Sequence, residues 1–179
     1  MGISFTRLFS SLAGNKEARI VFLGFGNAGK TTIIYRLQRM GKVVPRYATV
    51  GFNFESLHYN NINFQVWDVG GQTNIRPHWR SWFSNTNAII YVIDSSDMNT
   101  LAYAKKDFHS MLEEEEMKGV TVLLFANKQD LPGALDEVEM TEALELDKVK
   151  DRRFAIFKTC AVKDEGIFEG LDWLSNALV

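Results

Sequence analysis

The chain lacks the features that mark secreted and membrane-spanning proteins. Its 179 residues include one cysteine, Cys160, which cannot form an internal disulfide, and no basic stretch followed by an apolar core opens the chain, as it would in a secretory leader. The longest apolar runs, at residues 88–93 and 120–126, are far shorter than the ~18 residues that a membrane-spanning helix needs. We therefore expect an intracellular protein that does not span a membrane.

Proline and low-complexity sequence are also scarce. The chain has three prolines, and 46% of its residues are apolar, as is usual for globular domains, in which about 45–50% are apolar. The composition that keeps polypeptides unfolded is therefore absent. Since domains average roughly 150 residues, and no linker or repeat divides the sequence, we expect one domain with one core.

Acidic residues are few in the first part of the chain. Residues 1–80 hold ten Lys and Arg against three Asp and Glu, whereas residues 81–179 hold ten against nineteen. No acidic residue occurs between Ala18 and Phe54, and the six basic residues there are Arg19, Lys30, Arg36, Arg39, Lys42 and Arg46. This pattern favours binding of phosphates or of an anionic surface, the alternative being a solvated basic face.

Short apolar runs of strand length alternate with helical patterns. The expected strands are 20–23, 52–59, 62–67, 88–93, 120–126 and 154–157. The expected helices are 31–40, 101–117, 140–146 and 168–178, with one more starting at Pro77. The alternation predicts an α/β fold with a six-stranded, mostly parallel sheet and helices on both faces, and the runs that flank Asn60 and Asn61 predict a hairpin.

A glycine-rich motif, Gly24-Phe25-Gly26-Asn27-Ala28-Gly29-Lys30-Thr31, matches the phosphate-binding loop pattern G-x-x-x-x-G-K-[ST] and lies between a strand and a helix. Its glycines let backbone N–H groups and the helix N-terminus point at phosphates, Lys30 can reach the outer phosphates, and the Thr31 hydroxyl can ligate Mg²⁺. The residues expected to contact phosphates are Gly24, Gly26, Asn27, Ala28, Gly29, Lys30, Thr31, Thr32 and Gly71.

A second motif, Asp68-Val69-Gly70-Gly71-Gln72, follows the strand at 62–67. The carboxylate of Asp68 can hold Mg²⁺ through water, the Gly71 N–H can meet the terminal phosphate, and Gln72 can orient an attacking water. We therefore expect Gln72, Lys30 and Gly71 to be the catalytic residues of a nucleoside triphosphate hydrolase.

A third motif, Asn127-Lys128-Gln129-Asp130, ends the strand at 120–126, at the carboxyl edge of the sheet where α/β proteins bind ligands. Its last carboxylate can accept hydrogen bonds from two N–H groups that guanine has and adenine lacks. Alone the motif could be a solvated turn, but together with the other two it predicts GTP rather than ATP.

Six stretches carry a family resemblance, in family order between residues 2 and 178: MGISFTRLF, GFGNAGKTT, TVGFNFE, FQVWDVGGQTNIRPHW, FANKQDLPGAL and TCA. They are similar to those of small GTPases of the ADP-ribosylation factor (Arf) and Arf-like family, in particular its Golgi branch. The resemblance implies the P-loop small GTPase fold. It assigns Thr49 to Mg²⁺, Lys128 to the face of the base, the Cys160–Ala161 backbone to the guanine oxygen, and Asn127 and Asp130 to the guanine site.

The resemblance also implies how such a switch is used. A monomer would bind GTP or GDP with Mg²⁺, would cycle with an exchange factor and a GTPase-activating protein, and would bind coiled-coil Golgi tethers or other effectors, but no nucleic acid. Effectors would read an apolar patch of Phe52, Trp67 and Trp82, for which core packing is the alternative. The hairpin at 52–67 would slide in register when GTP binds.

The first 15 residues predict a membrane-binding helix ahead of a GTP-binding domain at 16–179. Residues 1–6 fit M-G-x-x-x-[ST], which makes Gly2 a myristoylation site. One helical face carries Phe5, Leu8, Phe9 and Leu12. Since a myristoyl chain alone binds membranes only marginally, at ~10⁴ M⁻¹, this face must supply a second signal. We expect a cytoplasmic protein that attaches reversibly to Golgi membranes with GTP; a permanently docked helix is the alternative.

The sequence departs from the family pattern at several positions. Gly26 stands where relatives carry Asp, Ala48 where they carry Pro, and Trp82 where they carry Tyr, and residues 38–41 hold one extra residue. The loss of a carboxylate at Gly26 predicts tighter phosphate binding or altered turnover. The loss of proline at Ala48 predicts a more mobile switch loop.

Two other functions remain possible from the residues. A nucleotide kinase would need an acceptor site and an arginine-rich lid, and neither is visible in the sequence. A GTP-binding structural module that never cycles is disfavoured by Thr31, Thr49 and Gln72. Arg76 and Arg80 lie near Gln72, but we expect an activating protein to supply the arginine finger, so intrinsic hydrolysis is expected to be slow.

Overall fold

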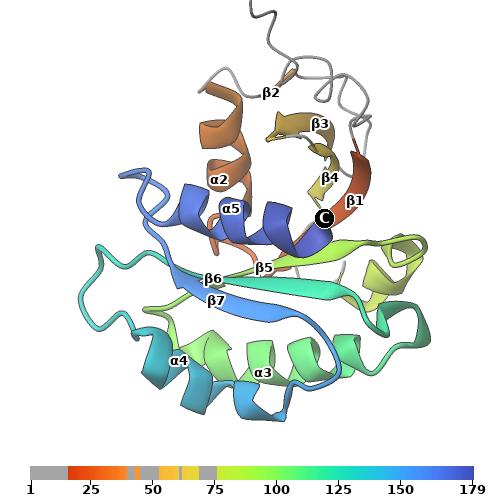
Figure 1. The fold of residues 1–179 in the computed structure, drawn as a ribbon. Coiled ribbons are helices and arrows are strands. Elements are labelled where there is room, and N and C mark those ends of the chain that lie inside the picture. The colour runs from red at the N-terminus through yellow and green to blue at the C-terminus, as the bar shows by residue number, and fades with distance from the viewer. Residues whose placement is uncertain (1–15, 40–42, 45–52, 61, 69–75) are drawn as a thin grey trace, which may run out of the picture.

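The computed structural model describes residues 16–39, 43–44, 53–60, 62–68 and 76–179 (Figure 1). Its sheet has the strand order β2-β3-β4-β1-β5-β6-β7. The strand bounds are β1 Lys16–Gly24, β2 Val43–Val44, β3 Asn53–Tyr59, β4 Ile62–Asp68, β5 Ala88–Asp94, β6 Thr121–Asn127 and β7 Phe154–Lys158. Strands β4, β1, β5, β6 and β7 pair in parallel, whereas β3 pairs antiparallel with both β2 and β4.

The six expected strands are all present, and the expected hairpin is β3–β4. Asn60 forms its turn with φ of 51°, a left-handed conformation that asparagine tolerates. The additional strand β2 is a two-residue extension at the sheet edge, too short for its residues to show a strand pattern in the sequence.

Helices cover both faces of the sheet, with α2 and α5 on one side and α3 and α4 on the other (Figure 1). The helix bounds are α2 Lys30–Leu37, α3 Met98–Leu112, α4 Glu137–Ala143 and α5 Ile167–Leu178. Short 3₁₀ helices are η2 Arg76–Trp82, η3 Glu115–Met117 and η4 Leu146–Lys148. None of the described helices is both long and apolar enough to cross a bilayer.

Three helices differ from the expected bounds, for local reasons. Helix α4 starts before residue 140 because Asp136 and Glu139 form a capping box. Helix α3 likewise starts early, since the Asp97 carboxylate accepts from two backbone N–H groups, and its expected C-terminal part is the separate 3₁₀ helix η3. Helix α2 ends at Leu37, before the expected residue 40, and a π-helical turn follows at residues 38–39.

Strand side chains alternate between two apolar layers. In β1, Ile20 and Phe22 belong to the layer under α2 and α5, whereas Val21 and Leu23 belong to the layer over α3 and α4. Strands buried on both faces read as continuous apolar runs, which is why the sequence located them. The parallel arrangement brings the carboxyl ends of β1, β5 and β6 to one edge of the sheet.

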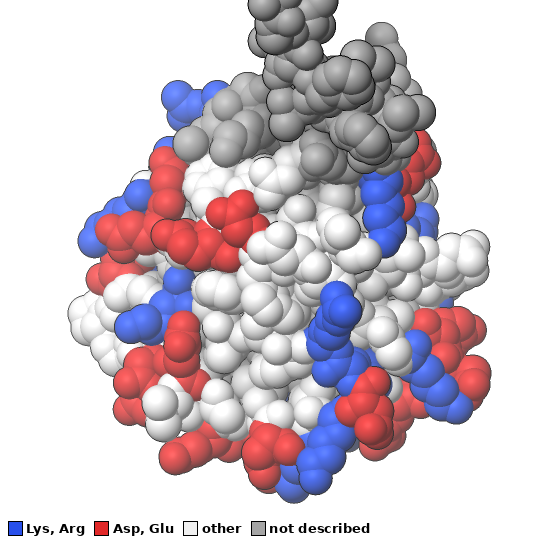
Figure 2. Space-filling view, viewed as in Figure 1, with Lys and Arg blue, Asp and Glu red and all other residues white. Residues whose placement is uncertain are grey.

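The charge asymmetry of the sequence is visible on the surface. On the face shown in Figure 2, acidic side chains lie along the left, lower and right borders, with lysine and arginine side chains between them. This agrees with the acidic excess of residues 81–179.

Candidate nucleotide-binding site

The loop between β1 and α2 has a backbone that only glycine can adopt at two positions. Gly24 has φ of 138°, and a Cβ there would lie 2.1 Å from the carbonyl oxygen of Val92 on β5. Gly29, immediately before α2, has φ of 102°. The glycines of the motif therefore serve a tight turn against the neighbouring strand, which leads the chain into the helix N-terminus.

Lys30 is held inside this loop. Its side chain is 7% exposed, and its ammonium donates to the carbonyl oxygens of Gly24 and Phe25, each at 2.9 Å. A buried ammonium at a helix N-terminus adds positive charge to the backbone N–H groups of the loop. This arrangement fits a phosphate group.

Asn127 joins the phosphate loop to the segment that follows β7. The amide is 1% exposed, and its Nδ2 donates to the Ala28 carbonyl at 2.9 Å. Its Oδ1 accepts from the Thr159 hydroxyl at 3.2 Å and from the Ala161 N–H at 3.1 Å. One side chain thus ties the end of β6 to two other segments that are distant from it in the sequence.

The residues expected at the base lie next to this junction. The Cys160 thiol donates to Oδ1 of Asp130 at 3.2 Å, and burial, together with that carboxylate, raises the pKa of the thiol. Cys160 is a buried residue, as expected, and its thiol also orients Asp130. The Lys128 ammonium pairs with Oδ2 of Asp94 at 2.7 Å.

Asp94, at the end of β5, has a lowered pKa because hydrogen bonds from Lys128 and Ser96 outweigh the opposing effect of burial. A carboxyl with a lowered folded-state pKa stabilises the fold above its unfolded value, here 3.8, and loses this contribution as the pH falls through the folded value. Asp94→Asn is therefore expected to lower the free energy of unfolding by about 1 kcal/mol at neutral pH. In urea titrations, the difference from wild type is expected to vanish in acid.

A matched control for Asp94 is Glu116→Gln, which removes a charge from an exposed position. It is expected to change neutral-pH stability by less than about 0.5 kcal/mol. A deficit in Asp94→Asn that persists unchanged at the lowest pH would contradict the ion-pair explanation.

The two described tryptophans of the expected effector patch are in contact. The rings of Trp67 on β4 and Trp82 on η2 lie 5.5 Å apart, and both side chains are half-buried. Arg19 lies over the Trp67 ring at 4.2 Å and donates to the Trp82 carbonyl at 3.1 Å. Each ring also packs on the core layer of α3 and α4, as the core-packing alternative expects, and the effector role of the two rings stays a prediction.

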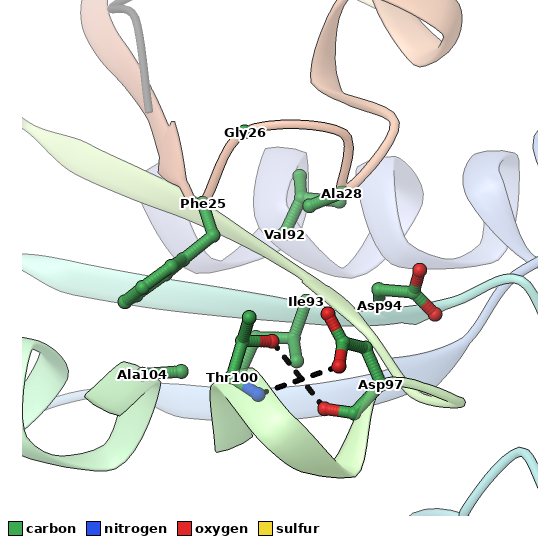
Figure 3. A pocket seen from close by; sticks show the side chains of 9 residues that line it. All are labelled: Phe25, Gly26, Ala28, Val92, Ile93, Asp94, Asp97, Thr100 and Ala104. Carbon is green, nitrogen blue, oxygen red and sulfur yellow. Dashed lines mark hydrogen bonds between the residues drawn. The ribbon is translucent and has the colours of Figure 1, made fainter. Parts of the chain in front are cut away.

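Gly26 borders a small pocket beneath the phosphate loop. The pocket has a volume of about 10 Å³, room for about one water molecule. Figure 3 shows Phe25, Gly26 and Ala28 on the loop side, with Asp94 and Asp97 on the other. A carboxylate at position 26 would thus stand near two others and beside the expected phosphates.

Gly26→Asp is expected to release GDP about five times faster than wild type, because like charges at close range raise the free energy of the bound state by roughly 1 kcal/mol. Stopped-flow release of a fluorescent GDP analogue measures this rate. Gly26→Asn matches the size without the charge and is expected to stay near wild type. Equal release rates in wild type and Gly26→Asp would sink the electrostatic explanation.

Several expected site residues fall outside the described parts of the chain. These are Gly2, Thr49, Phe52, Gly71 and Gln72. For Asp68 the backbone alone is described, at the end of β4 and opposite Phe22 of β1. The structure brings together the phosphate loop, Asn127, Lys128, Asp130, Cys160 and Ala161 at one edge of the sheet.

The sequence did not predict the contacts of three residues of this region. Arg19 and Arg36 were noted only as members of a basic stretch, but Arg19 contacts the tryptophan patch and Arg36 contacts the loop after β7. Asp94, which pairs with Lys128 of the base motif, was not singled out. Arg80, considered above as a nearby arginine, pairs with Glu114 just beyond the C-terminal end of α3. Thr100, near the start of α3, lines the pocket beneath the phosphate loop. Arg80 is therefore held at the other end of α3, away from the expected phosphates.

Comparison with known proteins gives one consistent result. The model of the ADP-ribosylation factor family matches residues 5–178. ADP-ribosylation factor 1 from Brassica rapa subsp. pekinensis and ADP-ribosylation factor 3 from Arabidopsis thaliana are each 68% identical over 178 residues, which are 99% of this chain and 97% of each relative.

A solved structure agrees in fold. The Arl6 BBS3 small GTPase from Trypanosoma brucei with the bound nucleotide analogue GppNp superposes with a TM-score of 0.81 and 35% identity, covering 91% of this chain and 98% of that one. The expected P-loop small GTPase fold is confirmed. The chain belongs to the ADP-ribosylation factor family of small GTPases, which bind GTP and hydrolyse it.

Proposed function

We propose that the chain is a GTP-dependent membrane switch of Golgi vesicle traffic. The observation that supports it most directly is the position of Asn127, which holds the phosphate loop and the base segment together through Ala28 and Ala161. A nucleotide bound across this junction would be read at its phosphates and at its base. A structural GTP-binding module that never cycles would share this site, and the experiments below distinguish the two.

The phosphates would be held by the backbone of residues 24–32 and by the Lys30 ammonium. Thr31, which is exposed in the first turn of α2, would offer its hydroxyl to Mg²⁺ together with Thr49 and, through water, Asp68. These are oxygen donors, the type that Mg²⁺ prefers. When bound, the ion would neutralise charge on the outer phosphates.

The base would be held by the motif at the end of β6. The Asp130 carboxylate, oriented by the Cys160 thiol, would accept from the guanine N–H groups. The backbone N–H groups of Cys160 and Ala161 donate to the Glu165 carbonyl and to Asn127 Oδ1 in this structure, so one of them would be shared with the guanine oxygen when nucleotide binds. Lys128, anchored by Asp94, would lay its aliphatic chain along the ring. Adenine would leave the Asp130 carboxylate without donors.

Hydrolysis would depend on Gln72, which would orient the attacking water, while Lys30 and the Gly71 N–H stabilise charge on the transferred phosphate. An arginine from an activating protein would complete the site and raise the rate by about 10³ to 10⁵. Arg80 pairs with Glu114, which supports an arginine supplied by the activating protein and not by this chain. Exchange factors would reload the protein with GTP.

Membrane recruitment would use the myristoylated Gly2 and the apolar face of the helix in residues 1–15. Release of this helix would accompany GTP binding, and effectors such as coiled-coil Golgi tethers would then read Phe52, Trp67 and Trp82. The contact between Trp67 and Trp82 supports a shared patch.

Liposome co-sedimentation tests the proposal. Myristoylated protein, loaded with GDP or with a non-hydrolysable GTP analogue, is mixed with phosphatidylcholine–phosphatidylserine vesicles. Pelleting with the analogue alone, and its loss in Gly2→Ala, are expected. Equal partition in both nucleotide states would contradict a membrane switch.

Single-turnover hydrolysis separates a cycling GTPase from a structural module. With a family activating protein present, wild type is expected to convert GTP to GDP and Gln72→Leu is expected to stay GTP-bound. Absence of hydrolysis in wild type would favour the structural module, and equal rates in both would remove Gln72 from its role.

A further inference from the structure

The segment that carries the expected base contacts, residues 159–166, is a closed turn. The Cys160 N–H donates to the Glu165 carbonyl at 3.0 Å, and the Cys160 carbonyl accepts from Lys163 at 3.1 Å and from Glu165 at 3.2 Å. At its end, Gly166 has φ of 75°, and a Cβ there would lie 1.9 Å from the Lys158 carbonyl oxygen. With both ends tied, the turn moves as one unit, so a contact at its tip also fixes Cys160 and Ala161.

Arg36 on α2 makes such a contact. One guanidinium nitrogen, Nη2, donates to the Val162 carbonyl at 2.9 Å, and the other, Nη1, lies 3.4 Å from Oδ2 of Asp164. A planar guanidinium that binds a carbonyl and a carboxylate at once holds both in a defined geometry. The partners lie on the outer part of the turn, away from the buried Asn127 amide that holds its inner part.

The carboxylate of Asp164 needs a nearby positive charge, which Arg36 supplies. Asp164 has a left-handed backbone, with φ of 60°, and its Oδ1 is buried without a hydrogen-bond partner in the described part of the chain. The side chain as a whole is 38% exposed, so the cost of burial falls on this one oxygen, and a neighbouring cation reduces that cost. Without Arg36, we expect the turn to shift so that water reaches this oxygen.

We infer that Arg36 is a positioning residue that couples the base half of the nucleotide site to the phosphate half. It stands on the helix whose first residue, Lys30, belongs to the phosphate loop, and it holds the turn that would contact the guanine oxygen. The inference rests on the proposed nucleotide site. Its consequence is slow release of guanine nucleotide, because the turn cannot open away from α2 while Arg36 is in place.

The test is release of a fluorescent GDP analogue from Mg²⁺-loaded full-length protein. Arg36→Met is expected to release it about five times faster, the size of effect that a partly exposed charged hydrogen bond supports. Arg36→Lys keeps the charge but has a single donor nitrogen in place of the planar fork, and its release rate is expected to lie between those of wild type and Arg36→Met. Arg39→Met removes the same charge from an exposed position of the turn that follows α2 and is expected to match wild type.

A double-mutant cycle and hydrogen exchange separate positioning from general stability. Asp164→Asn removes the uncompensated charge, so the double variant with Arg36→Met is expected to release GDP no faster than Arg36→Met alone. Amide exchange in GDP-bound Arg36→Met is expected to rise at residues 159–166 and to stay unchanged in β5 and β6. A melting temperature within about 2 °C of wild type is expected as well.

Two results would overturn the inference. One is a wild-type release rate in Arg36→Met; the other is faster exchange throughout the sheet, which would mean that Arg36 only stabilises the fold. Failure of the proposed site is seen separately, because wild-type protein would then fail to bind the GDP analogue at all.

Discussion

Asp130→Asn is expected to lower the affinity for GDP by about 10³ and to raise that for xanthosine diphosphate. A carboxylate only accepts hydrogen bonds, whereas an asparagine amide also donates. In the proposed site guanine would present two N–H groups toward this side chain, so the new NH₂ would face donors and leave them unpaired. Xanthine has a second carbonyl in place of the amino group, which the NH₂ can reach. Sites that pair buried donors with acceptors discriminate by factors of this size or larger.

The structure gives a reason to expect that Asp130→Asn changes the nucleotide preference without unfolding the protein. The Asp130 side chain is exposed. The Cys160 thiol donates a hydrogen bond to its Oδ1, and the side-chain oxygen of an asparagine can accept the same bond. Competition of each diphosphate against a fluorescent GDP analogue measures the two affinities. Glu137→Gln, on an exposed residue at the start of α4, removes the same charge and is expected to change neither.

An equal loss of affinity for both nucleotides would mean that Asp130 supports the fold of the site without reading the base. Unchanged affinity for GDP would mean that the base lies elsewhere. Only an inverted preference agrees with a base that pairs with this side chain.

The sequence predicted those parts of the molecule whose signals are local. Apolar runs located β1, β5, β6 and β7, and of these β5, β6 and most of β1 are buried on both faces, whereas β7 is half-buried. A turn residue, Asn60, located the hairpin. The phosphate loop and the motif at Asn127 are recognisable because their function needs fixed residue types at fixed spacing. Their common edge follows from parallel pairing, which places strand ends together.

The remaining features depend on contacts between residues far apart in the chain. Asn127 donates to Ala28 across 99 positions, and Arg36 reaches Asp164 across 128. No periodicity or spacing encodes such pairs, since each residue is individually an ordinary polar side chain. The start of α4 was also misplaced, because the apolar pattern marks where a helix becomes buried, whereas its cap at Asp136 marks where it begins.

Gly29→Ala is expected to reduce GDP affinity by at least about 10³, or roughly 4 kcal/mol. The backbone at Gly29 has φ of 102°, and an added Cβ would lie 2.3 Å from Nδ2 of Asn127. The amide would have to leave the Ala28 carbonyl, to which it donates at 2.9 Å. The phosphate loop and the base segment would then lose their shared anchor.

Gly119→Ala separates backbone strain from this contact. Gly119 also has a positive φ, of 70°, but a Cβ there would have no atom within 4 Å. Its alanine variant is therefore expected to lose about 1 kcal/mol of stability and to bind GDP like wild type. Calorimetric titration with GDP and thermal unfolding without it measure the two effects for both variants.

The GDP affinities and stabilities of these two alanine variants show whether binding needs the junction at Asn127. If both variants lose stability and both keep GDP affinity, strained backbone is tolerated at either position and the Asn127 junction is not needed for binding. If Gly29→Ala alone loses affinity, the loss is specific to the phosphate loop, where the added Cβ disturbs both the backbone of Gly29 and the amide of Asn127. Nucleotide binding then depends on the junction between two motifs nearly a hundred residues apart.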